Sequence, residues 1–151
     1  LARPPGPEYR GDVPPHARAE KDKAYPASPS GMTGVQTLVP IMLDHVNAGR
    51  LSLQRFVDLT SHGVNRIFGL ADKGRIAEGF DADFTIVDMK ARRVITHDWM
   101  ATRSGWTPFD GFEAKAWPVA TIVRGTVVMR DDEIVAEGTG APVRFLETLA
   151  G

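Results

Sequence analysis

An acid and a histidine stand four residues apart near the beginning of the sequence, Asp12 and His16 in Asp-Val-Pro-Pro-His. A glycine- and proline-punctuated loop at Ser28–Thr37 follows and leads directly into an apolar run with helical spacing. A carboxylate can move a proton, and carboxylates and histidines are metal ligands. Short polar residues also occur in proline-rich loops for turn formation alone, so the spacing by itself leaves a functional and a structural interpretation open.

Four histidines, His16, His45, His62 and His97, occur in a chain that contains no cysteine. Disulfides, thiolate nucleophiles and cysteine-ligated zinc are therefore excluded, and any metal must use histidine and carboxylate ligands. None of the histidines forms a His-x-His pair. We interpret His45 as a surface or boundary residue, His62 as a helix-end residue and His97, beside Asp98, as part of a turn.

Composition is typical of a globular protein, with 42% hydrophobic and 25% charged residues among 151. The formal net charge of -1 gives no electrostatic footprint for nucleic acid or an anionic membrane. No apolar run is long enough to cross a bilayer, and the first residues lack the apolar core of a signal peptide. Together with the absence of cysteine, this leads us to expect a cytoplasmic protein with neither partner.

The elements that must position these residues begin with helices. Apolar residues recur at helical spacing from Val35 to Val46, and Pro40 inside this run predicts a kink or a helix start nearby. Ser52 is the expected N-cap of a second helix. A third short helix is expected over 65–68, with Gly69 at its C′ position.

Strands are expected after the helices. The predicted strands are Phe84–Val87, Arg93–Thr96, Val119–Val123 and Val127–Met129. Turns are expected at residues 124–126 and 131–133, and a last helical turn at 145–149. The three tryptophans, Trp99, Trp106 and Trp117, are expected to pack, and the charged run 21–23 to be a solvated loop.

This order predicts an α+β chain in three regions: a loop region at 1–34 that carries the Asp-x-x-Pro-His motif, helices at 35–70, and a small β domain with a C-terminal tail at 71–151. A complete (β/α)8 barrel takes about 250 residues, so 151 residues cannot form one.

Two segments carry a resemblance to a known family. The stretch 21–76 is similar throughout to dihydroorotases, and its loop Ser28–Gly34 favours them among the cyclic amidohydrolases. The segment Ile76–Asp83 (IAEGFDAD) resembles a pattern shared by most cyclic amidohydrolases. The resemblance covers roughly residues 12–136 and implies the C-terminal part of a metal-dependent hydrolase (β/α)8 barrel with the small β domain beside it.

The resemblance also implies roles for individual residues. Asp12 corresponds to the catalytic aspartate that binds the metal and carries the proton of the metal-bound water, whose pKa the metal lowers. His16 corresponds to a residue that faces the substrate's carboxylate. The backbone at Pro29, Ser30 and Gly31 corresponds to the segment that contacts the edge of the pyrimidine ring, where glycine permits close approach.

The activity implied is the reversible hydrolysis of dihydroorotate to N-carbamoyl-aspartate in pyrimidine synthesis, with one or two zinc ions in the full-length protein. The other ligands of the family, a His-x-His pair, a carboxylated lysine and two histidines, lie upstream of the stretch matched here. We therefore expect this chain alone to bind no zinc and to be inactive.

The implied partners are a small-molecule substrate, and the N-terminal barrel portion or another copy of the chain. Two alternatives remain open. One is a cyclic amidohydrolase of the allantoinase or hydantoinase type. The other is a non-catalytic dihydroorotase-like scaffold for a partner such as aspartate transcarbamoylase, which Val13, next to Asp12, permits.

Overall fold

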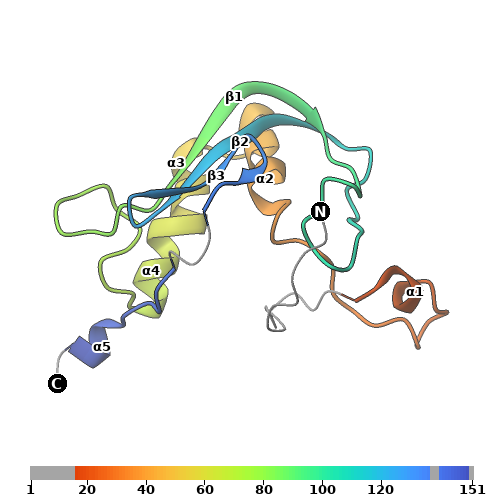
Figure 1. Ribbon diagram of the computed structural model, residues 1–151, viewed down its shortest axis with the longest axis horizontal. Helices are drawn as coiled ribbons and strands as arrows, with labels where there is room; N and C mark the ends of the chain where they lie inside the picture. The colour runs from red at the N-terminus through yellow and green to blue at the C-terminus, as the bar shows by residue number, and fades with distance from the viewer. Residues whose placement is uncertain (1–15, 137–139, 150–151) are drawn as a thin grey trace. The chain divides into compact units, whose positions relative to one another are not determined.

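The computed structural model describes residues 16–136 and 140–149, in which helices precede the strands and one short helix follows them (Figure 1). This is the predicted α+β order. No helix within those two ranges is long and apolar enough to cross a membrane. The elements are α1 (Arg18–Lys21), α2 (Leu38–Asn47), α3 (Leu53–Val57), the π-helical turn η1 (Asp58–His62), α4 (Gly63–Phe68), β1 (Phe84–Val94), β2 (Glu113–Val123), β3 (Thr126–Arg130), β4 (Glu133–Ile134) and α5 (Leu146–Leu149).

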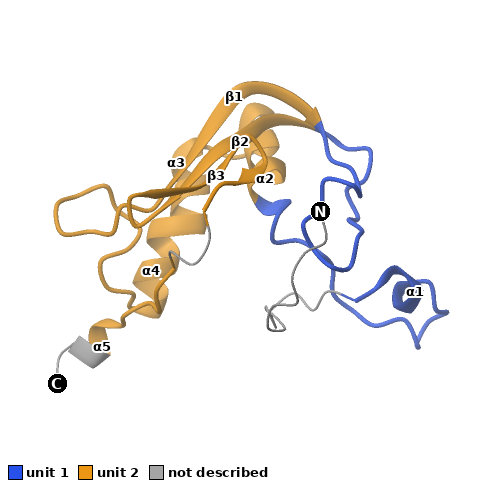
Figure 2. Ribbon diagram, in the orientation of Figure 1, with its two compact units in different colours: residues 1–38, 94–113 blue, residues 39–93, 114–151 orange. Residues whose placement is uncertain are grey.

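Two compact units make up the chain (Figure 2). The first unit combines residues 1–38 with residues 94–113, and the second combines residues 39–93 with residues 114–151. The three-region division at 1–34, 35–70 and 71–151 stays a prediction.

The helix boundaries follow local signals in the sequence. Helix α2 begins at Leu38, so Pro40 lies in the first turn, where a missing backbone N–H leaves no hydrogen bond unmade. The side chain of Ser52 accepts a hydrogen bond of 3.1 Å from the backbone N–H of Arg55 and caps α3, as predicted. Gly69 ends α4 with a φ of 61°, a left-handed conformation that favours glycine.

The four strands form one sheet in the order β1-β2-β3-β4. Strands β2 and β3 are antiparallel, and Arg124 and Gly125 between them have φ values of 50° and 82°, typical of a two-residue type I′ turn. Asp131 and Asp132 turn the chain in the same way before β4, which is antiparallel to β3. Both turns were expected from the sequence.

Strand β1 differs from the prediction. The sequence predicted two short strands, Phe84–Val87 and Arg93–Thr96, separated by polar residues. The structure has one continuous strand of 11 residues, hydrogen-bonded to β2, which is also 11 residues long. Most of the interrupting side chains are exposed, so pairing with a long neighbour decides the length of β1 more than its own apolar pattern does.

The apolar core of the second unit lies between α2, α3 and the sheet (Figure 1). Leu43 of α2 and Ala116 of β2 are fully buried, and Phe56 of α3 packs with them. Partly buried side chains from these helices, the loop between them and β1 surround the three: Val39, Met42, Val46, Leu51, Val87 and Met89.

Two polar side chains fix α2 to the strands. The carboxylate of Asp44, 7% exposed, accepts a hydrogen bond of 3.2 Å from the backbone N–H of Lys115 and lies 3.4 Å from Arg50. Asn47 donates through Nδ2 to the carbonyl oxygen of Met89, at 3.1 Å, and to that of Lys115. Because the buried carboxylate of Asp44 must be paired, and because Asn47 bonds the backbone of both strands, these bonds define the position of α2 along β1 and β2 more narrowly than apolar contact can.

Candidate functional site

The loop expected to contact substrate is held by Lys21, the last residue of α1. Lys21 donates through Nζ to the carbonyl oxygen of Gly31, at 2.9 Å, and to that of Pro29. The carbonyl oxygen of Lys21 accepts a hydrogen bond of 3.0 Å from Ser28 Oγ. Gly31 has a φ of 94°, which a residue with a Cβ rarely adopts. The loop therefore closes on α1 through three hydrogen bonds to one residue.

Trp106, which is 8% exposed, connects this loop with His16. Its indole Nε1 donates to the carbonyl oxygen of His16 at 2.7 Å, and its own carbonyl oxygen accepts from Thr33 Oγ1 at 2.6 Å. The Nζ of Lys21 lies 6.0 Å from the centroid of the indole ring, within the range of a cation–π contact. Trp106 therefore contacts His16 and Lys21 through its indole ring, and Thr33 through its backbone carbonyl oxygen.

Further along, Gln36 ties the end of the loop to a second turn of the same unit. Its Nε2 donates to the carbonyl oxygen of Trp99 at 3.0 Å, and its Oε1 accepts from the backbone N–H of Ala101 at 2.8 Å. An amide side chain that bonds backbone groups on both of its atoms has a defined orientation. The loop is thus fixed by polar contacts from Ser28 to Gln36.

The predicted site residues have different outcomes. Asp12 lies outside the described residues, so its catalytic and metal-binding roles stay predictions. The structure brings His16 and the backbone of Pro29 and Gly31 into one cluster through Lys21 and Trp106. Ser30 is exposed between its two neighbours.

The imidazole of His16 is partly exposed. Its Nδ1 lies 3.6 Å from Oε2 of Glu20, and 30% of the side chain is accessible. An imidazole in this setting can still present a nitrogen to a ligand, as expected for a residue that faces a substrate carboxylate. Whether it does so in this protein stays a prediction.

Sequence reasoning missed Lys21. The charged run at 21–23 was expected to be a solvated loop, and this is wrong for Lys21, which is half-buried and bonds two backbone carbonyls. Its acceptors are main-chain oxygens 8 and 10 residues later, and every residue type carries such an oxygen. The pattern therefore contained no signal that could have identified it.

His97 forms the other titratable cluster of the first unit. It lies in a turn, as predicted, and its Nδ1 accepts a hydrogen bond of 3.1 Å from the backbone N–H of Thr107. The other ring nitrogen, Nε2, lies 3.2 Å from Nη1 of Arg18 and 3.6 Å from Oδ2 of Asp110. The other carboxylate oxygen of Asp110 accepts from the backbone N–H of His97 at 2.8 Å. Asp110, rather than the adjacent Asp98, is the carboxylate that pairs with His97.

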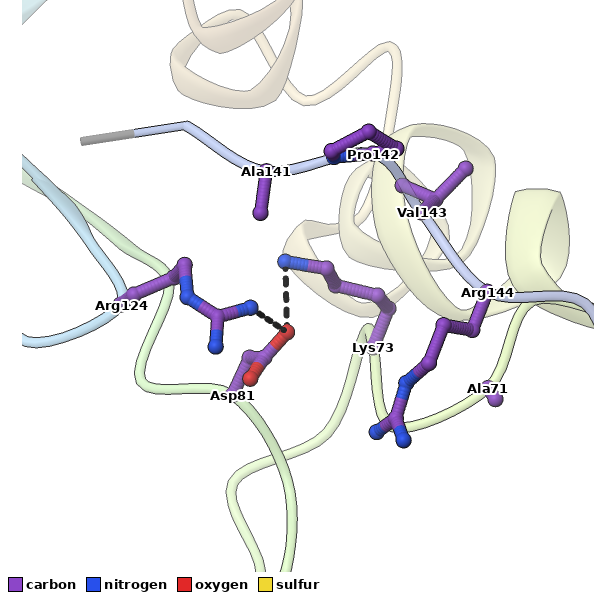
Figure 3. Close-up of a pocket in the computed structure, with 8 residues that line it drawn as sticks. All are labelled: Ala71, Lys73, Asp81, Arg124, Ala141, Pro142, Val143 and Arg144. Atoms are coloured by element: carbon purple, nitrogen blue, oxygen red, sulfur yellow. Dashed lines mark hydrogen bonds and ion pairs between the residues drawn. The ribbon is translucent and has the colours of Figure 1, made fainter. Parts of the chain in front are cut away.

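A pocket of about 360 Å³ lies in the second unit, where the charged ends of Lys73 and Arg124 converge on Asp81, and Arg144 also lines it (Figure 3). Lys73 Nζ is 2.9 Å from Oδ2 of Asp81 and also pairs with Asp83. Arg124 lies 3.3 Å from the same oxygen of Asp81.

The charges around this pocket are balanced within the protein. Arg124 donates its backbone N–H to Asp83 at 2.7 Å, and Arg144 pairs with Asp72. The hydrogen bond with Asp83 raises the pKa of Lys73 against the opposing effect of burial. Burial favours the neutral form of Asp83, but the bonds from Lys73 and Arg124 outweigh it and lower the pKa of that carboxyl. The pocket lies where separate segments of the chain meet. Its cations, Lys73, Arg124 and Arg144, are already paired with carboxylates of the protein.

No group of three or more His, Asp and Glu side chains lies close enough to hold a metal ion within residues 16–136 and 140–149. The donor set of this part of the chain does not fit a catalytic zinc, which takes at least three protein ligands. Most or all ligands of a bound metal would have to come from outside these ranges, and a role for Asp12 among them stays a prediction.

Comparison with known proteins gives the family. Residues 41–129 match the amidohydrolase family. The dihydroorotase of Pyrococcus furiosus is 41% identical over 134 residues, 89% of this chain and 31% of the relative. The dihydroorotase of Methanothermobacter thermautotrophicus is 43% identical over 129 residues, 85% of this chain and 30% of the relative. The chain therefore spans about a third of the length of these curated relatives.

Solved structures of hydantoinases are similar in fold. The L-hydantoinase of Arthrobacter aurescens superimposes with a TM-score of 0.71 at 35% identity, over 75% of this chain and 26% of that one. The D-hydantoinase of Thermus sp. gives a TM-score of 0.73 at 32% identity, over 83% and 28%. The resemblance to cyclic amidohydrolases, and to dihydroorotases among them, is confirmed by these matches. This chain belongs to the amidohydrolase family.

Proposed function

We propose that the protein containing this chain is a dihydroorotase that interconverts dihydroorotate and N-carbamoyl-aspartate in pyrimidine synthesis. The observation that carries the proposal is an identity of 41–43% with two dihydroorotases over 85–89% of the chain. The geometry of the first unit supports it, because His16 and the backbone at 29–31 form one braced cluster.

Each residue has a stated part in this proposal. The carboxylate of Asp12 takes a proton from the attacking water and returns it to the leaving nitrogen. His16 and the backbone of Pro29, Ser30 and Gly31 bind the polar edge of the substrate. Zinc, one or two ions, would supply a water of lowered pKa in the full-length protein.

The (β/α)8 barrel is part of the same proposal. Large apolar side chains of the second unit are exposed, among them Ile67 at 75%, Phe68 at 64% and Ile76 at 88%. Exposed apolar side chains at this density are typical of a surface that another part of the protein covers. We propose that the remaining two thirds of the relatives' length, or a second copy, covers them. A complex with aspartate transcarbamoylase is a further proposal of this kind.

A hydantoinase is the second candidate, since the similar solved structures described above are hydantoinases. The test is the kcat/KM of the full-length protein on dihydroorotate, hydantoin and allantoin, with zinc supplied. We expect dihydroorotate to be the best substrate. A clear preference for hydantoin or allantoin would replace the proposal with the second candidate, and no turnover of any of the three would favour the non-catalytic scaffold.

The role of Asp12 has its own test. Asp12→Asn in the full-length protein is expected to lower kcat by about 10²–10⁴, the range typical of general acid–base catalysis, because an amide cannot carry the proton. Asp22→Asn is the matched control, since Asp22 is an exposed acid whose described ion pair, with Arg18 at 3.5 Å, is a surface one. A near-normal kcat for Asp12→Asn would show that another acid carries the proton.

A further inference from the structure

We infer that Lys21 is a positioning residue for substrate binding, whose ammonium sets the orientation of the peptide groups in the loop 29–32. The inference rests on the proposed function for the identity of the substrate. Lys21 contacts the loop backbone and the indole of Trp106, not the reacting atoms. Its effect passes through the backbone of the loop.

The ammonium of Lys21 fixes the direction of two carbonyl groups in the loop. The carbonyl oxygens of Pro29 and Gly31 both accept from Lys21 Nζ. In a trans peptide the N–H of the next residue points opposite to the carbonyl oxygen. The N–H groups of Ser30 and Met32 are therefore directed away from Lys21. Two backbone donors that are turned away from Lys21 suit the carbonyl or carboxylate oxygens of a cyclic ureide acid.

The ammonium of Lys21 is itself positioned by Trp106. The Nζ of Lys21 stands over the indole of Trp106, whose Nε1 bonds the carbonyl oxygen of His16 and whose own carbonyl accepts from Thr33. The charged group is thus bonded directly to the loop expected to bind substrate, and it is linked to His16 through the indole of Trp106. A hydrogen bond from an ionised donor is stronger than one between neutral groups, so the carbonyls are held firmly.

A lysine that orients the carbonyls and a lysine that only packs respond differently to substitution. If Lys21 only contributed to packing, an apolar side chain of similar length over the indole would replace it. If Lys21 orients the carbonyls, the N–H donors of its ammonium are essential and its aliphatic chain is not. Lys21→Met keeps the stem and removes the donors, whereas Lys21→Arg keeps a charged donor of similar reach. Lys23→Met is the matched control, because Lys23 is an exposed lysine two residues away.

The kinetic experiment uses the full-length protein with dihydroorotate. We expect Lys21→Met to raise KM by about tenfold or more with kcat within about threefold, because it removes binding without touching the reacting atoms. Lys21→Arg should have a KM much closer to that of the parent protein, and Lys23→Met should have the same KM and kcat as the parent. An unchanged KM in Lys21→Met, or a fall in kcat at constant KM, would overturn the inference.

A second measurement does not depend on activity. The rate of thermolysin cleavage within residues 28–35 of the folded full-length protein, followed by mass spectrometry, reports local opening of the loop. Lys21→Met should increase it by about tenfold or more, while cleavage in the hairpin 123–131 stays unchanged. Equal cleavage of the loop in both proteins would refute the positioning role. A parent that fails to act on dihydroorotate would refute the proposed function instead, and the cleavage comparison would still show whether Lys21 holds the loop.

Discussion

Gly74 and Gly69 allow the cost of a close contact to be separated from the cost of a left-handed backbone. Both glycines have positive φ, 77° and 61°. A Cβ built on Gly69 would meet nothing within 4 Å, whereas one on Gly74 would lie 2.1 Å from Nδ2 of Asn65 and 3.4 Å from Cα of His62. The same substitution to alanine therefore probes the backbone alone at Gly69, and the backbone plus a steric clash at Gly74.

The magnitudes follow from this difference. A left-handed conformation costs an L-residue about 1–2 kcal/mol. The reduced freedom of the unfolded chain offsets about 0.4–1 kcal/mol of this, so Gly69→Ala should destabilise the protein by about 1 kcal/mol. Overpacking adds about 1–3 kcal/mol at Gly74. Because the clashing atom is the end of a side chain, the lower part of that range applies, and Gly74→Ala should cost about 2–3 kcal/mol in total.

The assay is urea denaturation of the full-length protein and its variants, with Asn65→Ala and the double variant completing a cycle. The Nδ2 of Asn65 is buried and has no hydrogen-bond partner among the described residues. Asn65→Ala should therefore change stability little and should relieve the clash in Gly74→Ala by about 1–2 kcal/mol. If Gly74→Ala and Gly69→Ala were equally destabilising, or if Asn65→Ala gave no relief, the contact between residues 65 and 74 would not exist as described.

Three further outcomes are expected. Ser52→Ala should destabilise α3 by about 1 kcal/mol in the same denaturation assay, and Ser52→Asp should not, because only the former removes the acceptor for the N–H of Arg55. Since the pKa of Asp83 is lowered, its contribution to stability should be present above pH about 4 and be lost as the pH falls through the folded-state pKa. Since the pKa of Lys73 is raised, its contribution to the free energy of unfolding should be complete below pH about 10.4 and be lost above the folded-state pKa. Lys73→Met removes the ion pair with Asp83, so it should reduce the loss of stability at both low and high pH. The isolated 151-residue chain should bind a hydrophobic dye, self-associate in light scattering and show no turnover of dihydroorotate, and a monodisperse monomer that binds no dye would contradict the proposed covering of its apolar surface.

Elements whose signals lie within a few residues could be predicted from the sequence. The cap at Ser52, the helix end at Gly69 and the turn at Arg124-Gly125 are of this kind, because the residue and the backbone group or dihedral angle that it serves are neighbours. The length of β1 could not be predicted, because its partner β2 begins 19 residues after β1 ends. Local polarity suggested a break that pairing overrides.

The candidate site divides in the same way. The loop at 28–34 was singled out by its glycine and proline pattern and its resemblance; in the structure it is linked to His16 through Lys21 and Trp106, and its contact with substrate stays a prediction. Trp106, which connects the two, is 90 residues from His16 and was expected only to pack. Nothing in the residues near His16 indicates that its carbonyl oxygen has an indole partner, because main-chain acceptors are the same at every position.

Contacts from a side chain to the backbone recur where this chain must be positioned narrowly. Lys21 holds two carbonyls of the loop in the first unit, and Asn47 and Asp44 hold backbone groups of Met89 and Lys115 in the second. Such contacts do not depend on which side chain the acceptor residue carries. Sequence variation at backbone partners with ordinary φ angles is therefore compatible with the same geometry, whereas a side chain at Gly31, with its φ of 94°, or loss of the donor or acceptor side chain is not. It follows that the residues controlling the loop and α2 are the polar side chains that reach the backbone, and that the residues they reach contribute mainly their place in the chain.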